Sequence, residues 1–192
     1  MNVKNNNLTL ILGSLAALAP TNEIRYYLNG VLVECDQDGN KYMVVTNGHY
    51  MVFAELRGTL ADCVSIERNT RAILDVNQLK RILKAIGKGA VSITINEDNA
   101  TLHQDTGLDG TINCIEGRFP EWRRVNNPIE KAEFTALNAD YLVKLMREFK
   151  KHSSKKAGFG VMVETADANH ASRFTLDAKE YTITALLMGV RL

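Results

Sequence analysis

The sequence is poor in cysteine, and its cysteines lack the spacing of a metal site or a disulfide framework. Cys35, Cys63 and Cys114 stand far apart, whereas both kinds of site need paired cysteines. The histidines are scattered as well, at positions 49, 103, 152 and 170. We therefore expect three reduced thiols, no bound metal or other cofactor, and a cytoplasmic protein.

The chain also has little net charge and no long apolar run. Its 23 basic and 22 acidic residues give a net charge of +1, which argues against a highly basic nucleic-acid binder but not against a basic patch on one face. The apolar stretch 8–19 is shorter than the about 20 residues that span a bilayer. Only Lys4 precedes it, so it lacks the basic start of a signal peptide. We expect no membrane partner.

Three helical patterns are present, and they recur roughly every 65 residues, as in a repeat protein. They cover residues 6–19, 76–87 and 139–152. The residues expected to cap or end these helices are Pro20, Asp75 with Gln78 in a capping box, Gly87, and Asn138.

Three β-rich runs follow each helical pattern. They are 25–35, 41–46 and 49–56; then 90–97, 100–104 and 110–116; then 158–165, 172–178 and 181–190. A further run precedes each helix, at 71–76 and 131–137, with only the stub 1–5 before the first. This repeated unit of strand, helix and three strands predicts an α+β fold with antiparallel sheets and helices on one face.

Two of the helices carry basic stripes opposite their apolar faces. The second has Lys80, Lys84 and Lys88 four residues apart, with Arg81 beside them; the third has Lys144, Arg147 and Lys151. Each stripe alone is typical of a solvated helix face. Two stripes in a repeated unit favour a shared basic surface, although the first helix carries no basic residue.

Four segments resemble the bacterial DNA polymerase III β sliding clamp family. They read IRYYLNGVLVE, VTNGHYMVFAEL, IEGRFPEWRRV and LLMGVRL, and they occur in the family's order and at matching spacing. The resemblance implies the DNA-clamp fold, whose half-domain is the same unit of strand, helix and three strands.

The resemblance covers only part of a clamp. Residues 1–128 resemble the family's middle domain, and residues 129–192 resemble the second half of its third domain. We expect a cut-down clamp, of a kind that a phage or mobile element would encode. Clamps of this family are not enzymes: they encircle duplex DNA and hold a DNA polymerase on it.

The resemblance also implies a DNA-binding site. Helices line the channel of a clamp, and contacts to phosphates there are electrostatic and indifferent to base sequence. Arg25, Tyr26 and Tyr27 match family positions at the channel rim, although either tyrosine could instead pack within the sheet. The other candidates are Lys80, Arg81, Lys84, Lys88, Lys144, Arg147 and Lys151.

A second implied site is a groove that binds extended, partly apolar peptide motifs of polymerases and other partners. The matching positions are Leu28, Thr46, Gly48, His49, Tyr50, Met51, Pro120, Arg124, Val125, Leu186, Met188, Gly189, Val190 and Arg191. Several depart from the family pattern. Tyr50 and Met51 stand for Arg and Leu, Gly189 for Pro and Asn47 for Asp, so the preferred peptide is expected to differ.

Two residues within these segments invite other readings. His49 has no neighbouring nucleophile or carboxylate for a catalytic triad, and the sequence TNGH is typical of a tight hairpin turn. Trp122 could serve as a recognition residue, but we expect it to pack, as the aromatic residue does at the matching clamp position.

The unit count sets the expected assembly. Family rings hold twelve units, so a ring of chains with three units each would need about four chains, with the third unit paired to that of a second chain. A clamp loader is a further expected partner. The alternative is a peptide-binding module, a decoy or adaptor that never encircles DNA. An enzyme has almost no support among the residues.

Overall fold

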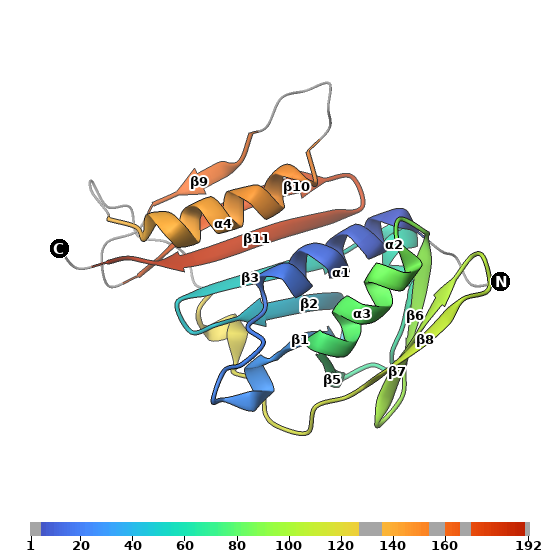
Figure 1. Cartoon of the computed structure of the whole chain (residues 1–192). Helices are drawn as coiled ribbons and strands as arrows, with labels where there is room; N and C mark the ends of the chain where they lie inside the picture. The colour runs from blue at the N-terminus through green and yellow to red at the C-terminus, as the bar shows by residue number, and fades with distance from the viewer. Residues whose placement is uncertain (1–4, 127–135, 154–159, 166–169, 191–192) are drawn as a thin grey trace.

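The computed structural model describes residues 5–126, 136–153, 160–165 and 170–190. Four α-helices and two short 3-10 helices alternate with eleven strands in this part of the chain (Figure 1). The helices are α1 (Asn6–Leu18), α2 (Gly58–Asp62), α3 (Val76–Ile86), α4 (Ala139–Lys150), η1 (Tyr26–Leu28) and η2 (Trp122–Arg124).

The strands form two sheets. The larger has the order β5-β1-β2-β3-β11-β10-β9 and is antiparallel throughout; the smaller has the order β4-β6-β7-β8, in which only β4 and β6 run parallel. The strands are β1 (Gly30–Cys35), β2 (Lys41–Thr46), β3 (Tyr50–Leu56), β4 (Val64–Ser65), β5 (Thr70–Asp75), β6 (Val91–Ile95), β7 (Asn99–Gln104), β8 (Asp109–Asn113), β9 (Met162–Glu164), β10 (Ala171–Ala178) and β11 (Tyr181–Met188).

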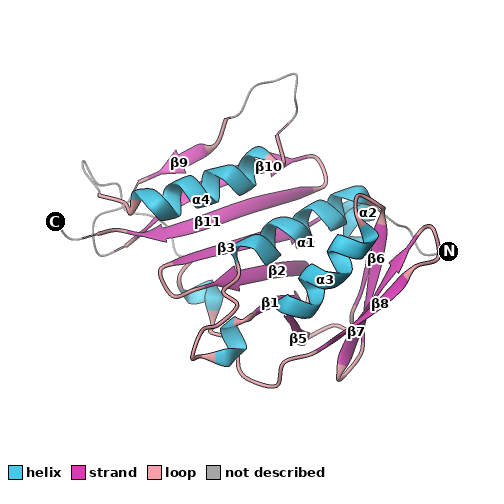
Figure 2. Ribbon diagram, in the orientation of Figure 1, coloured by secondary structure: helices cyan, strands magenta, loops and turns pink. Residues whose placement is uncertain are grey.

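The predicted repeat is present as three units. The first unit comprises α1 and β1 to β3, the second β5, α3 and β6 to β8, and the third α4 and β9 to β11. Helices α1, α3 and α4 cover the same face of the sheets (Figure 2). The α+β prediction and the one-faced placement of the helices are confirmed.

The opening strand of the second unit, β5, pairs with β1 of the first along its whole length, from Gly30↔Asp75 to Cys35↔Thr70. Asn5 of the first unit in turn forms a bridge with Val91 of β6 in the second unit. The first two units therefore interlock. The third unit joins through β11, which pairs with β3 from Tyr181↔Leu56 to Leu187↔Tyr50. The division into domains at residues 128 and 129 stays a prediction.

Local signals located the helix ends well. The side chains of Asp75 and Asn138 accept hydrogen bonds from the N–H groups of Gln78 and Tyr141, at 2.8 and 3.1 Å. Only half of the capping box predicted at α3 forms, because the Gln78 side chain does not accept a hydrogen bond from the Asp75 N–H. Its Oε1 accepts the N–H of Asn113 at 3.0 Å and so ties α3 to β8.

Two short helices, η1 and α2, were not predicted. Residues 26–28 form η1 rather than the start of a strand, and β1 begins only at Gly30. The short helix α2 follows β3, where the sequence shows no helical periodicity. The expected strand 131–137 lies mostly outside the described residues, and Leu137 makes only a bridge to Gly189.

Apolar side chains fill both faces of the larger sheet. One cluster lies between the helices and the sheets and includes Leu12, Val33 and Phe149. A smaller cluster lies on the opposite face and includes Leu32, Phe119 and Trp122. Neighbouring residues of β1 enter different clusters, as the alternation of side chains along a strand requires. The three cysteines are free thiols. None of the described helices has the length and apolar character that crossing a membrane requires.

Candidate functional site: a pocket where β3 meets β11

A pocket of about 310 Å³ opens where the first and third units meet, on the sheet face opposite the helices. Its walls come from η1, the β2–β3 turn, the segment around η2, and the strands β10 and β11. The lining residues are Arg25, Leu28, Thr46, Gly48, His49, Tyr50, Met51, Pro120, Val125, Ala171, Leu186 and Met188. Residues distant in sequence therefore converge on one apolar hollow.

The β2–β3 turn forms one wall, and its own side chains fix it. The Thr46 hydroxyl donates to the Tyr50 carbonyl at 2.7 Å and accepts the Gly48 N–H at 3.1 Å. The Asn47 Oδ1 accepts the N–H groups of His49 and Tyr50, both at 3.0 Å. Gly48 has a φ of +88°, a conformation that glycine adopts without strain. The hairpin expected for TNGH is confirmed.

The pocket has a buried floor and an exposed apolar rim. Leu28, Met51 and Leu186 are almost fully buried, whereas Val125 and Met188 stay exposed to solvent. Exposed apolar side chains at the edge of a concave site offer area that a bound segment can cover. The pocket thus combines a pre-formed floor with a surface that gains from being covered.

A buried carboxylate holds the segment around η2 in place. The Trp122 indole N–H donates to Glu34 Oε2 at 2.9 Å, and the Arg123 guanidinium donates to Glu34 Oε1 at 2.6 Å. Arg123 also lies over the rings of Trp122 and Tyr42. Trp122 therefore packs, as expected. Glu34 was not predicted as a structural residue of this site, although an acidic residue inside the apolar run GVLVEC was a usable signal.

Arg25 lies at the pocket rather than with the helices. Its Nε donates to Glu23 at 3.1 Å, and its guanidinium reaches the Asn47 carbonyl at 3.4 Å. This ion pair lowers the pKa of Glu23 through the hydrogen bond from Arg25. Tyr26 is exposed, and its ring meets that of the half-buried Tyr27 edge to face. Of the two tyrosines, Tyr26 is thus the one whose ring is more accessible to solvent.

Ten of the fourteen residues expected at a peptide site line this pocket. Arg124, Gly189 and Val190 do not line it, and Arg191 lies outside the described residues. Arg25 and Ala171 were not assigned to this site. Nothing in the sequence marks Ala171, because the register of β10 against β11 brings it there.

The helical face carries the predicted basic residues on both sides of α1. Lys88, just after α3, and Lys151, just after α4, line one hollow together with Thr9 and Gly13 of α1. Burial, and secondarily the charge of Lys144, lowers the pKa of Lys80. The uncharged helix α1 thus lies between two helices that carry basic residues. Arg81, Lys84 and Arg147 are exposed on the same two helices.

Two of these cations are engaged within the protein. The Lys144 ammonium donates to the Tyr50 hydroxyl at 3.1 Å, and that hydroxyl donates to the Leu18 carbonyl at 2.6 Å. Lys151 forms an ion pair with the mostly buried Glu148. Lys144 is therefore held against Tyr50, whose side chain lies in the cluster on the helix side of the sheet although the residue also lines the pocket.

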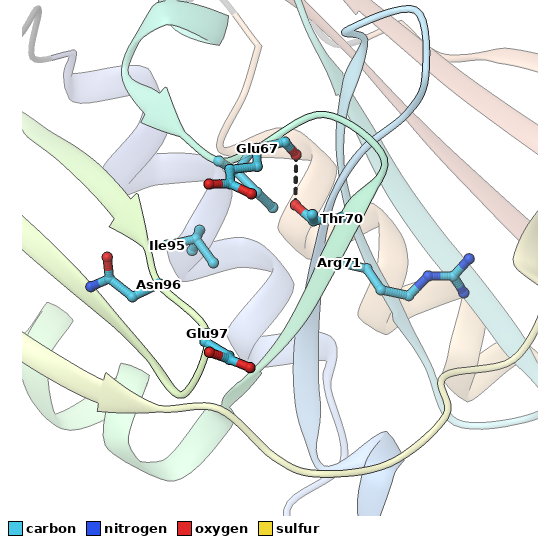
Figure 3. Close-up of a pocket in the computed structure, with 7 residues that line it drawn as sticks. Glu67, Thr70, Arg71, Ile95, Asn96 and Glu97 are labelled. Carbon is cyan, nitrogen blue, oxygen red and sulfur yellow. Dashed lines mark hydrogen bonds between the residues drawn. The ribbon is translucent and has the colours of Figure 1, made fainter.

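A different hollow lies between the turns that follow β4 and β6 (Figure 3). Glu67, Glu97 and Asn96 surround it, and Arg71 extends away from it toward Glu121, at 3.6 Å. The Thr70 hydroxyl donates to the Glu67 carbonyl at 2.6 Å. This polar, acidic hollow offers an apolar ligand little area. Within the described residues, no three potential metal ligands cluster.

No family model matches the chain, but a known protein is similar to it in sequence. The β sliding clamp of Proteus mirabilis is 28% identical over 106 residues, which are 54% of this chain and 27% of that protein.

Solved structures match over nearly the whole chain. The β clamp of Helicobacter pylori bound to a DNA ligase peptide has a TM-score of 0.76 and 14% identity, with 99% of this chain and 65% of that one covered. The DNA polymerase III β subunit of Pseudomonas aeruginosa has a TM-score of 0.70 and 15% identity, with 97% and 65% covered. The chain thus spans less than two thirds of these proteins. The chain is thus similar in sequence, over 106 residues, to one bacterial β sliding clamp, and it shares the fold of such clamps.

Proposed function

We propose that this chain is a clamp-type binding protein and not an enzyme. It binds an extended, partly apolar peptide motif of a DNA polymerase or another replication protein in the β3–β11 pocket, and it lays its helical face against duplex DNA. The pocket carries this proposal, because a pre-formed apolar hollow with a few polar groups suits a peptide. The peptide bound to the Helicobacter pylori clamp supports the same use of the fold.

The lining of the pocket indicates what such a peptide needs. Leu28, Met51 and Leu186 offer a dry floor for one or two apolar side chains. The Arg25 guanidinium at the edge would favour an acidic group or a carbonyl oxygen next to those side chains. We therefore propose a short segment in which apolar anchors adjoin an acidic residue.

The helical face is the proposed DNA-binding surface. Lysines of α3 and α4 lie on both sides of the uncharged α1, so they can reach phosphates on either side of it without reading bases. Tyr26 would meet the nucleic acid at the rim through its exposed ring. Encirclement would need a ring of about four chains, and loading such a ring would need a clamp loader.

One observation favours the alternative of a peptide-binding module without DNA encirclement. Lys144 and Lys151 are engaged by Tyr50 and Glu148, and α1 offers no cation of its own. Under this alternative the pocket works alone, as a decoy or adaptor for clamp-binding motifs.

Retention on plasmid DNA separates the two functions. A closed ring that a clamp loader has placed on nicked circular plasmid should stay there at about 0.15 M salt and slide off after the plasmid is linearised. The module should show no difference between the two DNA forms. Anisotropy of a labelled DNA ligase peptide tests the pocket on the same sample. Failure to bind this peptide or a library of acidic–apolar peptides would contradict both functions.

A further inference from the structure

Two similar short sequences occur at equivalent places in two units. Residues 30–35 read GVLVEC and residues 160–165 read GVMVET. The first segment is β1, the first strand after α1, and the second contains β9, the first strand after α4. Each pairs on one side with the next strand of its own unit, β2 or β10.

The surroundings of the two segments differ. β1 lies between β2 and β5, and Val31, Leu32 and Val33 are each 0% exposed. β9 is the last strand of its sheet in the described part of the chain, where Met162 is 62% and Val163 53% exposed. Of the two similar segments, the one in the first unit is buried and the one in the third is largely exposed. Exposed β-branched residues on an open edge favour pairing with a further strand.

The hydrogen-bond pattern shows which groups face that open edge. Met188 donates its N–H to His49 beside β3, at 3.2 Å. Alternate residues of an antiparallel strand bond to opposite neighbours. Met188 therefore directs its backbone groups toward β3. The registers of β11 with β10 and of β10 with β9 then place the backbone N–H and C=O groups of Met162 and Glu164 toward β10, and those of Val163 toward the open edge.

We propose that the β9 edge is a self-association surface that pairs with the β9 edge of a second copy about a two-fold axis. This proposal names the contact that the proposed ring requires, and it rests on that part of the proposed function. The first and second units already interlock through β5, so the third is the one that lacks a counterpart in the described chain. A second copy has a third unit with the same unpaired β9 edge in the described chain.

The edge is also complementary to itself. An antiparallel pair centred on Val163 sets it opposite the second copy's Val163 and exchanges two backbone hydrogen bonds there. In this register Met162 lies opposite the second copy's Glu164, which is paired with Arg173 at 3.0 Å. No like charges therefore face each other, and the exposed valines become covered.

Light scattering over a concentration series tests the contact on the full chain. The wild-type protein should reach a mass of at least two chains, and Val163→Asp and Val163→Lys should each halve that mass. Because residue 163 faces itself, an equal mixture of these two variants should regain the wild-type mass. Val163→Thr keeps the strand propensity and adds no charge, so it should assemble like the wild type.

Peptide binding separates this proposal from the proposed function. Val163→Asp should bind the labelled DNA ligase peptide within about twofold of the wild type, whereas Met188→Asp should lose the peptide and keep the wild-type mass. The self-association proposal is overturned by a monomeric wild type at all concentrations, by unchanged mass in both charged variants, or by a mixture that stays at half mass.

Discussion

The two faces of this molecule have opposite character. The pocket at the β3–β11 junction is concave and apolar, and hydrogen bonds within the β2–β3 turn and around Glu34 fix its walls. The helical face carries long basic side chains on two helices, several of them exposed. The pocket is therefore pre-formed, whereas the helical face is characterised by its positive charge.

This difference predicts different responses to solution conditions. Burial of apolar area depends weakly on salt, whereas each phosphate contact adds to a steep loss of affinity as salt rises. Peptide binding at the pocket should therefore persist at salt concentrations that abolish DNA binding. The connection from Lys144 to Tyr50 is the place where the two surfaces would influence each other.

The largest effect is expected from a charge placed in the pocket. Met188→Asp should weaken binding of the DNA ligase peptide on the order of 100-fold, about 3 kcal/mol, because the carboxylate would be covered by an apolar partner. Fluorescence anisotropy measures the loss. Met162→Asp is the matched control, since this methionine is also exposed but lies on β9. Equal losses in both variants would place the peptide elsewhere.

A smaller effect concerns the seam that joins α1, α4 and β11. His152 shares hydrogen bonds with Ser14 and Tyr181, at 2.9 and 3.0 Å. Burial, and secondarily the charge of Lys151, lowers the pKa of His152 to about 4. Because the unfolded chain binds this proton near its ordinary pKa of about 6.5, stability falls as the pH drops toward 4. Between pH 7 and 5 the loss should be about 2 kcal/mol.

Urea unfolding at several pH values checks this expectation. His152→Gln keeps a polar side chain but removes the titration, so its stability should change little between pH 7 and 5. The carboxylates whose pKa is lowered, such as Glu180 with its hydrogen bonds from Thr59, Asn5 and Asn7, act at lower pH. A variant as sensitive as the wild type in this window would show that another group is responsible.

The helical face should respond mainly through salt. Lys84→Glu with Lys88→Glu should weaken binding to a labelled DNA duplex about tenfold at 0.15 M salt and reduce the salt slope by about two, one for each lost phosphate contact. Neither lysine has the internal bond that Lys144 has, so the pocket should be unaffected. Arg68→Glu is the control, because Arg68 lies near the Gly39 turn rather than on a helix. A similar loss there would indicate nonspecific attraction.

Local features of the fold could be predicted from sequence, and long-range ones could not. Asp75 and Asn138 marked helix starts because a cap acts within one turn. The partner of Gln78, the position of Arg25 and the open edge of β9 depend on which strands meet, and no local pattern encodes that. Most of the pocket was predicted only through the family resemblance, since Leu28, Thr46, Pro120 and Leu186 share no periodicity.

The smallest expected effects come from two glycines, one on each face, that should respond with opposite signs. Gly48 has a φ of +88°, and a Cβ there would lie 3.0 Å from the Arg25 guanidinium, so Gly48→Ala should cost about 1 kcal/mol of stability. Gly13 lies within α1 with nothing within 4 Å of an added Cβ, so Gly13→Ala should gain about 1 kcal/mol. Urea unfolding gives both values. If Gly48→Ala were neutral, the turn would tolerate rearrangement, and the pocket would not be fixed before its peptide arrives.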